Sequence, residues 1–335
     1  MKNEFIQLAH GGGGRLSQKL MEDEILPRFG DGPLETLPDA ATIAVGSDHI
    51  VYSTDSFVVS PIEFPGGNIG ELAVYGTVND ISVAGGKAMW LSLSLIIEEG
   101  LPMAVLRKIL DSMKTAAEKC AVKIVTGDTK VVHRGQCDKI YINTSGIGTK
   151  YDDFNLSRTR ITPGDNVLSS GTAGDHGIAV LTSRESLKMG NGPMSDTAPV
   201  HNLVAAVRKY GQAVKFMRDP TRGGVAAVLN EMVKDLNFGI SLDEKNIPFS
   251  MAAKAAAEIL GLDLLNSPSE GRLVMICDSS ATDKILADWK QLPEGRDASV
   301  FGIVTKDSGR VILKTVSGGK RIVGMPSGEM LPRIC

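Results

Sequence analysis

The hydrophobic pattern of the first half of the chain alternates between helix-like and strand-like stretches. Apolar residues recur at helical spacing over 16–29 and 68–85, so a helix is predicted in each segment. A third helix is predicted over 101–120, where Pro102 stands in the first turn that proline favours. Alternating or continuous apolar runs predict strands at 42–59 (a hairpin with its turn near 46–49), 87–98, 122–125 and 139–148. Strands and helices that alternate in this way indicate an α/β or α+β fold.

A similar pattern restarts after the turn TPGD at 162–165, which we take as the boundary between two domains. Helices are predicted near 199–211 and over 225–236. Strands are predicted at 166–171, around 239–247, around 272–277 and in a final hairpin over 299–315. The predicted organisation is a glycine-rich segment with a helix (1–40), a first domain (41–160), a second α/β domain (161–320) and a C-terminal tail (321–335).

Composition and charge narrow the classes of partner. The 335 residues suffice for two domains of about 100 to 200 residues each. A net charge of −3, without blocks of lysine or arginine, argues against binding to nucleic acid or to an anionic membrane. The longest apolar stretch, 88–97, is too short to span a bilayer, and the N-terminus lacks the apolar core of a signal peptide. We therefore expect a cytoplasmic protein.

The four cysteines lack the spacing of a metal site or of a disulfide framework, and three of them, Cys120, Cys137 and Cys277, are expected to be inert. Cys335 is different because it is the last residue of PSGEMLPRIC, where Pro332 opposes helix formation. The last ten residues reach about 30 Å when extended, enough to carry a thiol between two sites. The alternative is a frayed terminus with an incidental cysteine.

The glycine run HGGGG at 10–14 is a candidate phosphate-binding segment. Without side chains, Gly11, Gly12, Gly13 and Gly14 let backbone N–H groups approach phosphate oxygens. The run is not a Walker A loop, because no GK[ST] follows it. A flexible linker near the terminus is the alternative.

Three aspartates follow elements that are predicted to be buried: Asp55 in STD, Asp80 in VND and Asp128 in GDTK. We expect them on one rim of the first domain, beside the small residues Asn79 and Gly127. Mg²⁺ binds carboxylate and phosphate oxygens together, so these residues are candidate metal ligands. The alternative for each one is the ordinary preference of Asp for turns and helix ends.

The segment RDPTRGG at 218–224 precedes a predicted helix, whose N-terminus attracts anions. Arg222 is a candidate phosphate contact, and Gly223 allows a close approach of the backbone. A structural ion pair between Arg222 and Asp219 is the alternative. The glycine-bracketed loop GTAGDHG at 171–177 is either a turn or a ligand contact, and its His176 is expected to be structural.

Taken in chain order, HGGGG, STD, VND, GDTK, GDHG, DPTRGG and SEGR resemble the motifs of one ATP-binding family. That family includes aminoimidazole ribonucleotide synthetase, selenophosphate synthetase and thiamine-monophosphate kinase. The terminal PRIC narrows the resemblance to the HypE hydrogenase maturation factors, the carbamoyl dehydratases, and it extends over essentially the whole chain. The resemblance implies a two-domain aminoimidazole ribonucleotide synthetase-like α/β (α+β) fold. It also implies a homodimer formed through an N-terminal mixed sheet, with ATP held between the domains.

The resemblance implies a carrier role for Cys335. The carbamoyltransferase HypF would transfer a carbamoyl group to this thiol, and ATP would be used to dehydrate the S-carbamoyl group to an S-cyanide (a thiocyanate). The cyanide ligand would then pass to iron on the HypC–HypD complex for a [NiFe] hydrogenase. The chemistry is consistent, because an amide oxygen leaves only after activation, which phosphorylation by ATP supplies.

Site roles follow from the same resemblance. Asp55, Asp80 and Asp128 would hold Mg²⁺, Lys130 would contact the transferred phosphate, and Glu270 in SEGR would be the base. The implied nucleotide contacts are Gly11, Gly12, Gly13, Gly14, Asn79, Gly127, Thr129, Arg222 and Gly223. For Lys130 and Glu270 the alternative is an ordinary surface charge.

Two other functions stay open at this point. One is another enzyme of the superfamily, such as a selenophosphate synthetase or a small-molecule kinase. A selenophosphate synthetase is expected to carry a reactive cysteine or selenocysteine near the glycine run, and QLAHGGGG has none. The other is a nucleotide-binding module whose tail docks on a partner without catalysis.

Overall fold

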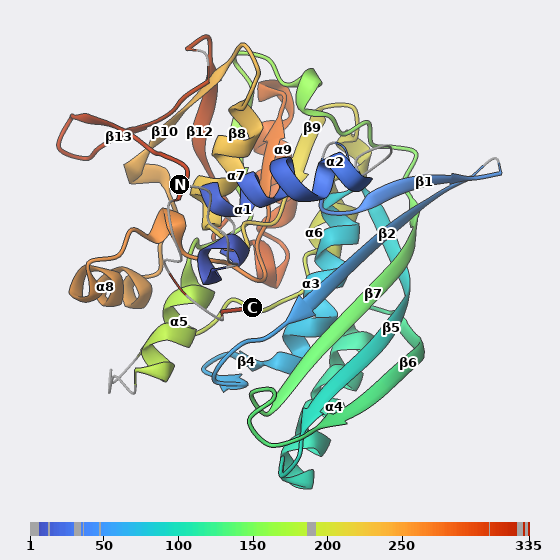
Figure 1. Ribbon diagram of the computed structural model, residues 1–335. Coiled ribbons are helices and arrows are strands. Elements are labelled where there is room, and N and C mark those ends of the chain that lie inside the picture. Colours follow the sequence, from blue (N-terminus) through green and yellow to red (C-terminus); the bar gives the residue numbers. More distant parts are fainter. Residues whose placement is uncertain are drawn as a thin grey trace.

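The structure is a computed structural model with two α/β domains, one for each half of the chain (Figure 1). It describes residues 7–12, 14–29, 35, 37–46, 48–185, 192–307, 309–326, 331 and 334–335. The first described element is the short turn η1 (Leu8–Gly11). One helical segment follows, built from α1 (Arg15–Leu20), the π-helical turn η2 (Met21–Ile25) and α2 (Leu26–Phe29). This segment confirms the helix predicted over 16–29.

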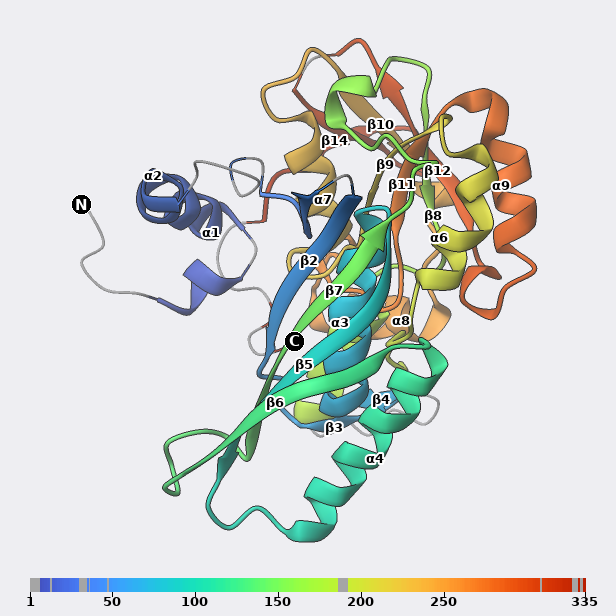
Figure 2. The same ribbon diagram turned by 90° about the vertical axis from the view of Figure 1, so that its right-hand side faces the viewer.

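The first domain is a mixed five-stranded sheet covered on one face by two helices (Figure 2). In spatial order its strands are β1 (Ala41–Val45), β2 (Asp48–Phe57), β7 (Ile140–Lys150), β5 (Gly86–Glu98) and β6 (Lys123–Val132). The covering helices are α3 (Ile69–Val83) and α4 (Met103–Lys119), and a small ribbon of β3 (Glu63–Phe64) and β4 (Gly67–Asn68) precedes α3. The predicted hairpin over 42–59 is confirmed as the antiparallel pair β1–β2.

Helix α3 is buried on nearly all sides because it lies between the first sheet and the second domain. It contacts β2, β5 and β7 on one side and α6 (His201–Val207) on the other. The Asn68 side chain caps it by accepting hydrogen bonds from the N–H groups of Gly70 and Glu71. A helix with apolar residues on every face is stable only in such a sandwiched position. Polar residues on α3 are thereby held at the junction of the two domains.

The second domain is a seven-stranded sheet flanked by helices. In spatial order its strands are β14 (Lys320–Ile322), β13 (Val311–Lys314), β10 (Gly239–Asp243), β12 (Ser299–Thr305), β8 (Asn166–Ser169), β11 (Val274–Cys277) and β9 (Val214–Arg218). Besides α6, its helices are α5 (Asp175–Arg184), α7 (Gly224–Val233), α8 (Met251–Leu260) and α9 (Thr282–Trp289). Short helical turns are η4 (Arg158–Arg160), η5 (Arg208–Tyr210), η6 (Glu244–Asn246), η7 (Leu264–Asn266), η8 (Ser279–Ala281) and η9 (Pro293–Gly295). The expected α/β class is confirmed.

Two local predictions are wrong. Residues 299–315 do not form a hairpin, because β10 lies between β12 and β13, antiparallel to one and parallel to the other. The motif GDTK is not a loop after a short strand at 122–125. It lies inside β6, which pairs with β5 in parallel from Lys123 to Val132. Within the described part of the chain, no helix combines the length and the apolar character that a bilayer crossing needs.

Candidate functional site

The C-terminus lies between the two domains, next to α3 and α5 in Figure 1. The side chain of Ile334 is buried and belongs to the hydrophobic cluster of the first domain. Its carbonyl oxygen accepts a 2.7 Å hydrogen bond from His176 Nε2, which lies on α5 of the second domain. The end of the tail is therefore held inward by both domains.

Charged side chains surround the half-buried thiol of Cys335. Desolvation raises its pKa to about 12; the negative charge of Glu270 adds to this effect, and the guanidinium of Arg222 opposes it. Asp55 and Asp219 also act to raise the pKa. The thiol is consequently neutral at neutral pH in this position, so it does not act as a thiolate nucleophile there.

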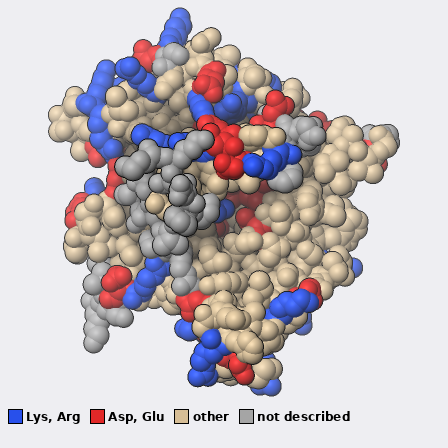
Figure 3. Space-filling view, in the orientation of Figure 1, with Lys and Arg blue, Asp and Glu red and all other residues tan. Residues whose placement is uncertain are grey.

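The acidic residues near Cys335 form a cluster of their own, which consists of Asp55 on β2, Asp80 on α3 and Asp219 in the loop before α7. Desolvation and the neighbouring carboxylates raise the pKa of Asp55 to about 6 and the pKa values of Asp80 and Asp219 well above the usual range. Ser53 Oγ donates a 2.6 Å hydrogen bond to Asp80 Oδ2. Figure 3 shows acidic side chains inside a hollow of this face.

The cluster has the donor chemistry that a hard divalent cation prefers. Buried carboxylates whose negative charges repel one another are stabilised when a cation binds between them. Among the described residues, no group of three or more His, Cys, Asp or Glu side chains is arranged to hold a metal ion. Mg²⁺ does not need a complete protein cage, because it keeps several waters and takes phosphate oxygens as further ligands. Asp55 and Asp80 therefore fit a partial Mg²⁺ site.

Glu270 is buried in the loop before β11. Its backbone N–H donates a 3.0 Å hydrogen bond to Asp196 Oδ1, while its Oε1 is buried and has no hydrogen-bond partner in the described part of the chain. Desolvation first, then Asp219 and Asp196, raise its pKa well above the usual range. A buried carboxylate with one oxygen unsatisfied can accept a proton from a group placed beside Cys335.

The loop before α7 brings a positive charge, the guanidinium of Arg222, to the site. Gly223 caps α7 with a left-handed backbone (φ 79°), a conformation that favours glycine. The pKa of Arg222 is raised chiefly by Cys335; desolvation acts in the opposite direction, and Asp55 and Glu270 add to the rise. Arg222 and the N-terminus of α7 thus border the space around the thiol.

Asn79 connects the two domains. Its Nδ2 donates to the carbonyl oxygens of Ala198 (3.1 Å) and Glu270 (3.2 Å), and its Oδ1 accepts from the N–H of Val200 (2.8 Å). The side chain thereby uses both of its amide hydrogens and its oxygen in backbone bonds. Its expected contact with the nucleotide stays a prediction.

The residues of GDTK lie on the edge strand β6, away from Cys335 and the acidic cluster. Asp128 and Lys130 are exposed on β6 and form a 2.8 Å ion pair, and the N–H of Thr129 donates to Asp128 Oδ1. Strands β5 and β7 separate β6 from β2, so about 14 Å of sheet lies between Asp128 and Asp55. One chain alone therefore brings Asp55 and Asp80 together but not Asp128. A Cβ at Gly127 would meet the carbonyl oxygen of Leu93 at 2.3 Å, which is a structural reason for that glycine.

The glycine run passes the base of the tail. Gly14 caps α1, and a Cβ there would lie 2.4 Å from the carbonyl oxygen of Pro326. The N–H of Arg15 donates to that same oxygen at 3.1 Å. Gly11 and Gly12 belong to the turn η1 and its end, and Gly13 lies outside the described residues. The run is close to the tail, and its role as a phosphate contact stays a prediction.

Local sequence did not single out Asp39 and Glu231, two acidic residues near the site. Asp39 and Glu231 form ion pairs with Arg218 at 2.6 and 2.8 Å. Asp39 also lies close enough to raise the pKa values of Asp55 and Asp219.

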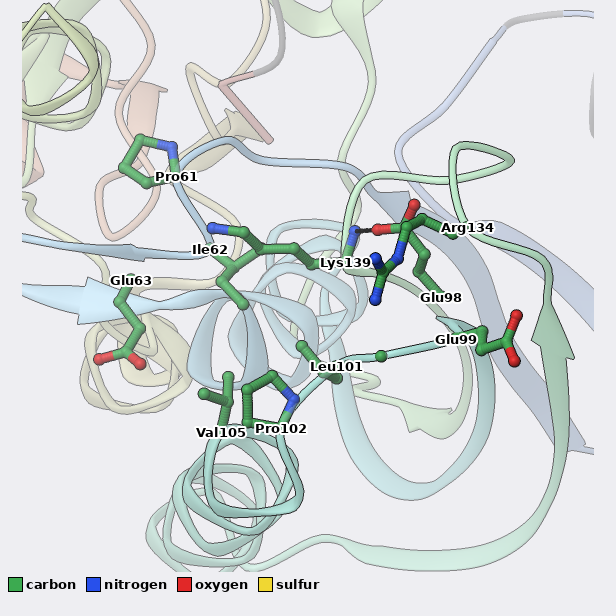
Figure 4. A pocket seen from close by; sticks show the side chains of 11 residues that line it. Pro61, Ile62, Glu63, Glu98, Glu99, Leu101, Pro102, Val105, Arg134 and Lys139 are labelled. Carbon is green, nitrogen blue, oxygen red and sulfur yellow. Dashed lines mark hydrogen bonds between the residues drawn. The ribbon is translucent and has the colours of Figure 1, made fainter.

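A cavity of ≈ 550 Å³ at the start of α4 contains none of the predicted site residues (Figure 4). Apolar side chains such as Ile62 and Val105 line it together with charged ones, including Glu98 and Arg134. Glu98 accepts hydrogen bonds from the N–H groups of Gly135 and Lys139. This cavity is separate from the cluster around Cys335.

Comparisons with known proteins match both halves of the chain. The family model "AIR synthase related protein, N-terminal domain" matches residues 38–149, and the corresponding C-terminal domain model matches 162–314. The carbamoyl dehydratase HypE of Bradyrhizobium diazoefficiens is 46% identical, over 100% of this chain and 97% of that protein.

Solved structures agree with these matches. The crystal structure of a HypE–HypF complex contains a chain with a TM-score of 0.87 and 44% identity, covering 92% of this chain and 99% of that one. HypE solved in complex with ATP has a TM-score of 0.82 and 40% identity, covering 99% and 100%. The two-domain aminoimidazole ribonucleotide synthetase-like fold expected from the motifs is confirmed.

Proposed function

Since the chain belongs to the HypE family of carbamoyl dehydratases, within the AIR synthase related proteins, we propose that it converts an S-carbamoyl group on its own Cys335 into an S-cyanide at the expense of ATP. The family resemblance predicted from the order of the motifs is confirmed. The product would supply the cyanide ligand of the iron in a [NiFe] hydrogenase. The inward position of Cys335, beside Glu270 and Arg222, is the observation that carries the proposal.

The reaction has a definite balance of atoms. The carbamoyl oxygen attacks the γ-phosphorus of ATP, ADP leaves, and the oxygen becomes part of a phosphate ester. Two protons then leave the carbamoyl nitrogen, the C–O bond breaks, and phosphate departs with the bonding electrons. The carbon–nitrogen bond becomes triple while the carbon–sulfur bond to Cys335 stays intact. The protein must therefore accept protons at the nitrogen and stabilise negative charge on the phosphate.

Glu270 is our candidate for the proton acceptor. Its buried Oε1 has no partner within the described residues, and its raised pKa makes it a stronger base than an exposed glutamate. Arg222 is positively charged and is our candidate for stabilising the negative charge on the phosphate. Both lie near the thiol only while the tail is inward.

ATP is proposed as the second substrate, since the ATP complex of HypE has the same fold over almost the whole chain. Asp55 and Asp80 would hold the accompanying Mg²⁺, which neutralises phosphate charge when bound. Gly11, Gly12, Gly14 and Gly223 are retained as candidate backbone contacts to the nucleotide.

A homodimer is proposed from the uncovered face of the first sheet. Large apolar side chains on this sheet are exposed in the single chain, among them Trp90, Ile96, Ile124, Val125 and Val131. Such a patch favours an interface with another protein surface. A second copy seated there is the arrangement that would give Asp128, Thr129 and Lys130 a place in a nucleotide site.

The partners follow from the need to load and unload the thiol. The complex of HypE with HypF supports a carbamoyltransferase of the HypF type as the donor. Delivery of cyanide to a HypC–HypD iron complex is the remaining part of the proposal. Because Cys335 is half-buried in its inward position, we infer that the tail moves outward to meet either partner.

Mass spectrometry of the intact protein tests the function. The chain is incubated with HypF, carbamoyl phosphate and ATP·Mg²⁺, and the C-terminal peptide is then mapped. We expect a carbamoyl adduct on Cys335. After separation from HypF and free nucleotide, the adduct should lose one water only when ATP is added again. The control is Cys335→Ala, which should keep its fold and ATP binding and acquire no adduct.

An unmodified tail beside an active HypF would refute the proposal. It would favour a kinase-type member of the superfamily or a docking module without turnover. Unfolding of Cys335→Ala would count against a carrier role as well, because a residue that only carries a group is not needed for folding.

A further inference from the structure

His176 makes hydrogen bonds through both ring nitrogens, and only one of them is to the tail. The residue is fully buried in the first turn of α5. Its Nε2 lies 2.7 Å from the carbonyl oxygen of Ile334, and its Nδ1 lies 2.8 Å from Ser195 Oγ. The ring of Phe64 packs edge-on against it, with the two centroids 5.2 Å apart.

These contacts determine where the ring carries its hydrogen. A backbone carbonyl only accepts, so Nε2 must be the protonated nitrogen. Desolvation lowers the pKa of His176 to about 4, so the ring is neutral and Nδ1 must accept from the Ser195 hydroxyl. Ser195 Oγ in turn accepts from the N–H of Thr197 at 3.1 Å and lies 2.7 Å from the hydroxyl of Thr197. The segment around Ser195 thereby sets the tautomer that points a donor at the tail.

Two further contacts of the tail meet the same part of the structure. A Cβ added to Gly177, the residue after His176, would lie 2.9 Å from Leu331 Cδ1. The first turn of α5 therefore lies against Leu331 as well as bonding Ile334. The Ile334 side chain is buried in the first-domain cluster. The tail is therefore held by apolar contacts together with the directional bond from His176.

We propose that His176 is a positioning residue that latches the C-terminal tail in its inward state. The bond to the Ile334 carbonyl holds the peptide that leads directly into Cys335, and so places the thiol beside Glu270 and Arg222. His176 touches no reacting atom in this scheme. The latch rests on the proposed function in one respect only: that function assigns dehydration to the inward state of the tail. Its effect on the tail can be measured without any turnover.

The test is the rate at which Cys335 of the full-length protein is alkylated by N-ethylmaleimide. The background is Cys137→Ser, because Cys120 and Cys277 are buried. His176→Leu removes the donor at similar volume, and we expect labelling about threefold to tenfold faster, the factor that one net hydrogen bond supplies. His176→Gln keeps an N–H donor at similar reach, so its rate should stay within about twofold of the background protein.

A second variant covers the case in which His176→Leu does not fold. Ser195→Ala removes the nearer hydroxyl at Nδ1 and leaves that of Thr197, 3.5 Å away. It weakens the bond that fixes the tautomer and should raise labelling by a smaller factor than His176→Leu. Equal labelling rates in folded His176→Leu and the background protein would overturn the latch. So would rates for His176→Gln as fast as those for His176→Leu.

The same variants separate the latch from the function. With Cys335 already carbamoylated, single-turnover dehydration should slow in His176→Leu, whereas transfer from HypF, which needs the tail outward, should not slow. Slower transfer together with unchanged dehydration would contradict the latch. If the wild-type chain neither accepts nor dehydrates a carbamoyl group while the labelling difference stands, the proposed function fails and the latch survives.

Discussion

The side-chain amide of Asn79 donates a 3.2 Å hydrogen bond to the carbonyl oxygen of Glu270, although 191 positions separate the two residues. The bond joins α3 of the first domain to the loop that carries the candidate base. The metal candidate Asp80 directly follows Asn79 on α3. One short segment therefore contributes both to the acidic cluster and to the position of Glu270.

Asn79→Ala should destabilise the protein more than a surface substitution. It leaves the backbone groups of Ala198, Val200 and Glu270 without their partner at a buried junction. We expect the free energy of unfolding to fall by about 2 to 4 kcal/mol, as measured by urea denaturation. Unchanged stability combined with weaker ATP binding would instead identify Asn79 as the nucleotide contact that the motif predicts.

Asp80→Asn should weaken Mg²⁺-dependent nucleotide binding and, at the same time, stabilise the protein without ligands. The amide keeps the shape and can still accept the hydrogen bond from Ser53, but it removes a carboxylate whose pKa is raised by desolvation and by Asp55. We expect the affinity for ATP in the presence of Mg²⁺ to fall about tenfold or more, as measured by calorimetry.

The matched control for Asp80→Asn is Asp128→Asn, on exposed β6. In the absence of ligands it should not raise the free energy of unfolding, because Asp128 is paired with Lys130 and its pKa is lowered by that partner. Full Mg²⁺-dependent affinity in Asp80→Asn would remove Asp80 from the metal site.

Glu270→Gln should separate dehydration from carbamoyl transfer. The substitution keeps the size of the side chain but removes its ability to accept a proton at the buried Oε1 position. We expect the rate of ATP-dependent dehydration to fall by about 10² to 10⁴. Carbamoylation of Cys335 by HypF and the dissociation constant for ATP should stay within about threefold, since neither needs the base. A variant that dehydrates at the normal rate would show that another group takes the protons.

The helices and strands that carry the site were easier to predict from the sequence than the way in which they lie next to one another. The run of apolar residues was sufficient to predict α3. Asp55 and Asp80 were expected on one rim of the first domain because each follows an element predicted to be buried. The separation of Asp128 was not foreseen, since it depends on the strand order β2–β7–β5–β6 and on β6 continuing through GDTK. Pairing between distant strands leaves no local pattern.

Charge partners were equally hard to foresee. Asp219 was expected, as one alternative, to form an ion pair with Arg222, and the structure places it in the acidic cluster beside Asp55. Arg218, for which no partner was predicted, forms ion pairs with Asp39 and Glu231. Which of two neighbouring arginines points toward a cluster depends on backbone direction at the end of β9, and sequence spacing does not determine it.

Lys130 should act on the nucleotide site of the other copy if the chain dimerises through its first sheet. Lys130→Ala and Glu270→Gln are each expected to be inactive. When the two variants are co-expressed with different tags and the mixed dimers are purified through both tags, each dimer should contain one intact site and show about half of the wild-type activity. If Lys130 instead served its own chain, every site would stay defective. Activity no higher than that of the separate variants would refute the shared site.

Burial of a neutral His176 should make the protein less stable in acid. Its pKa is lowered from 6.5 to about 4 in the folded chain, so the unfolded chain binds a proton first as the pH falls. The stabilisation is complete above pH 6.5 and is lost progressively toward pH 4, by about 3 kcal/mol in total. The raised pKa values of Asp80, Asp219 and Glu270 act in the opposite direction, because protonation favours the folded state at these residues.

The contribution of His176 is therefore measured as a difference between two proteins. Urea denaturation of the wild type and of His176→Gln, at pH 7 and at pH 4.5, cancels the carboxylate effects that the two proteins share. We expect the stability of the wild type to drop more steeply between these pH values than that of the glutamine variant, which has no ring to protonate. Parallel pH profiles would mean that burial leaves the pKa of the imidazole near its usual value. The ring would then be protonated at pH 4.5 in the folded chain and could no longer accept the hydrogen bond from Ser195 that orients the latch.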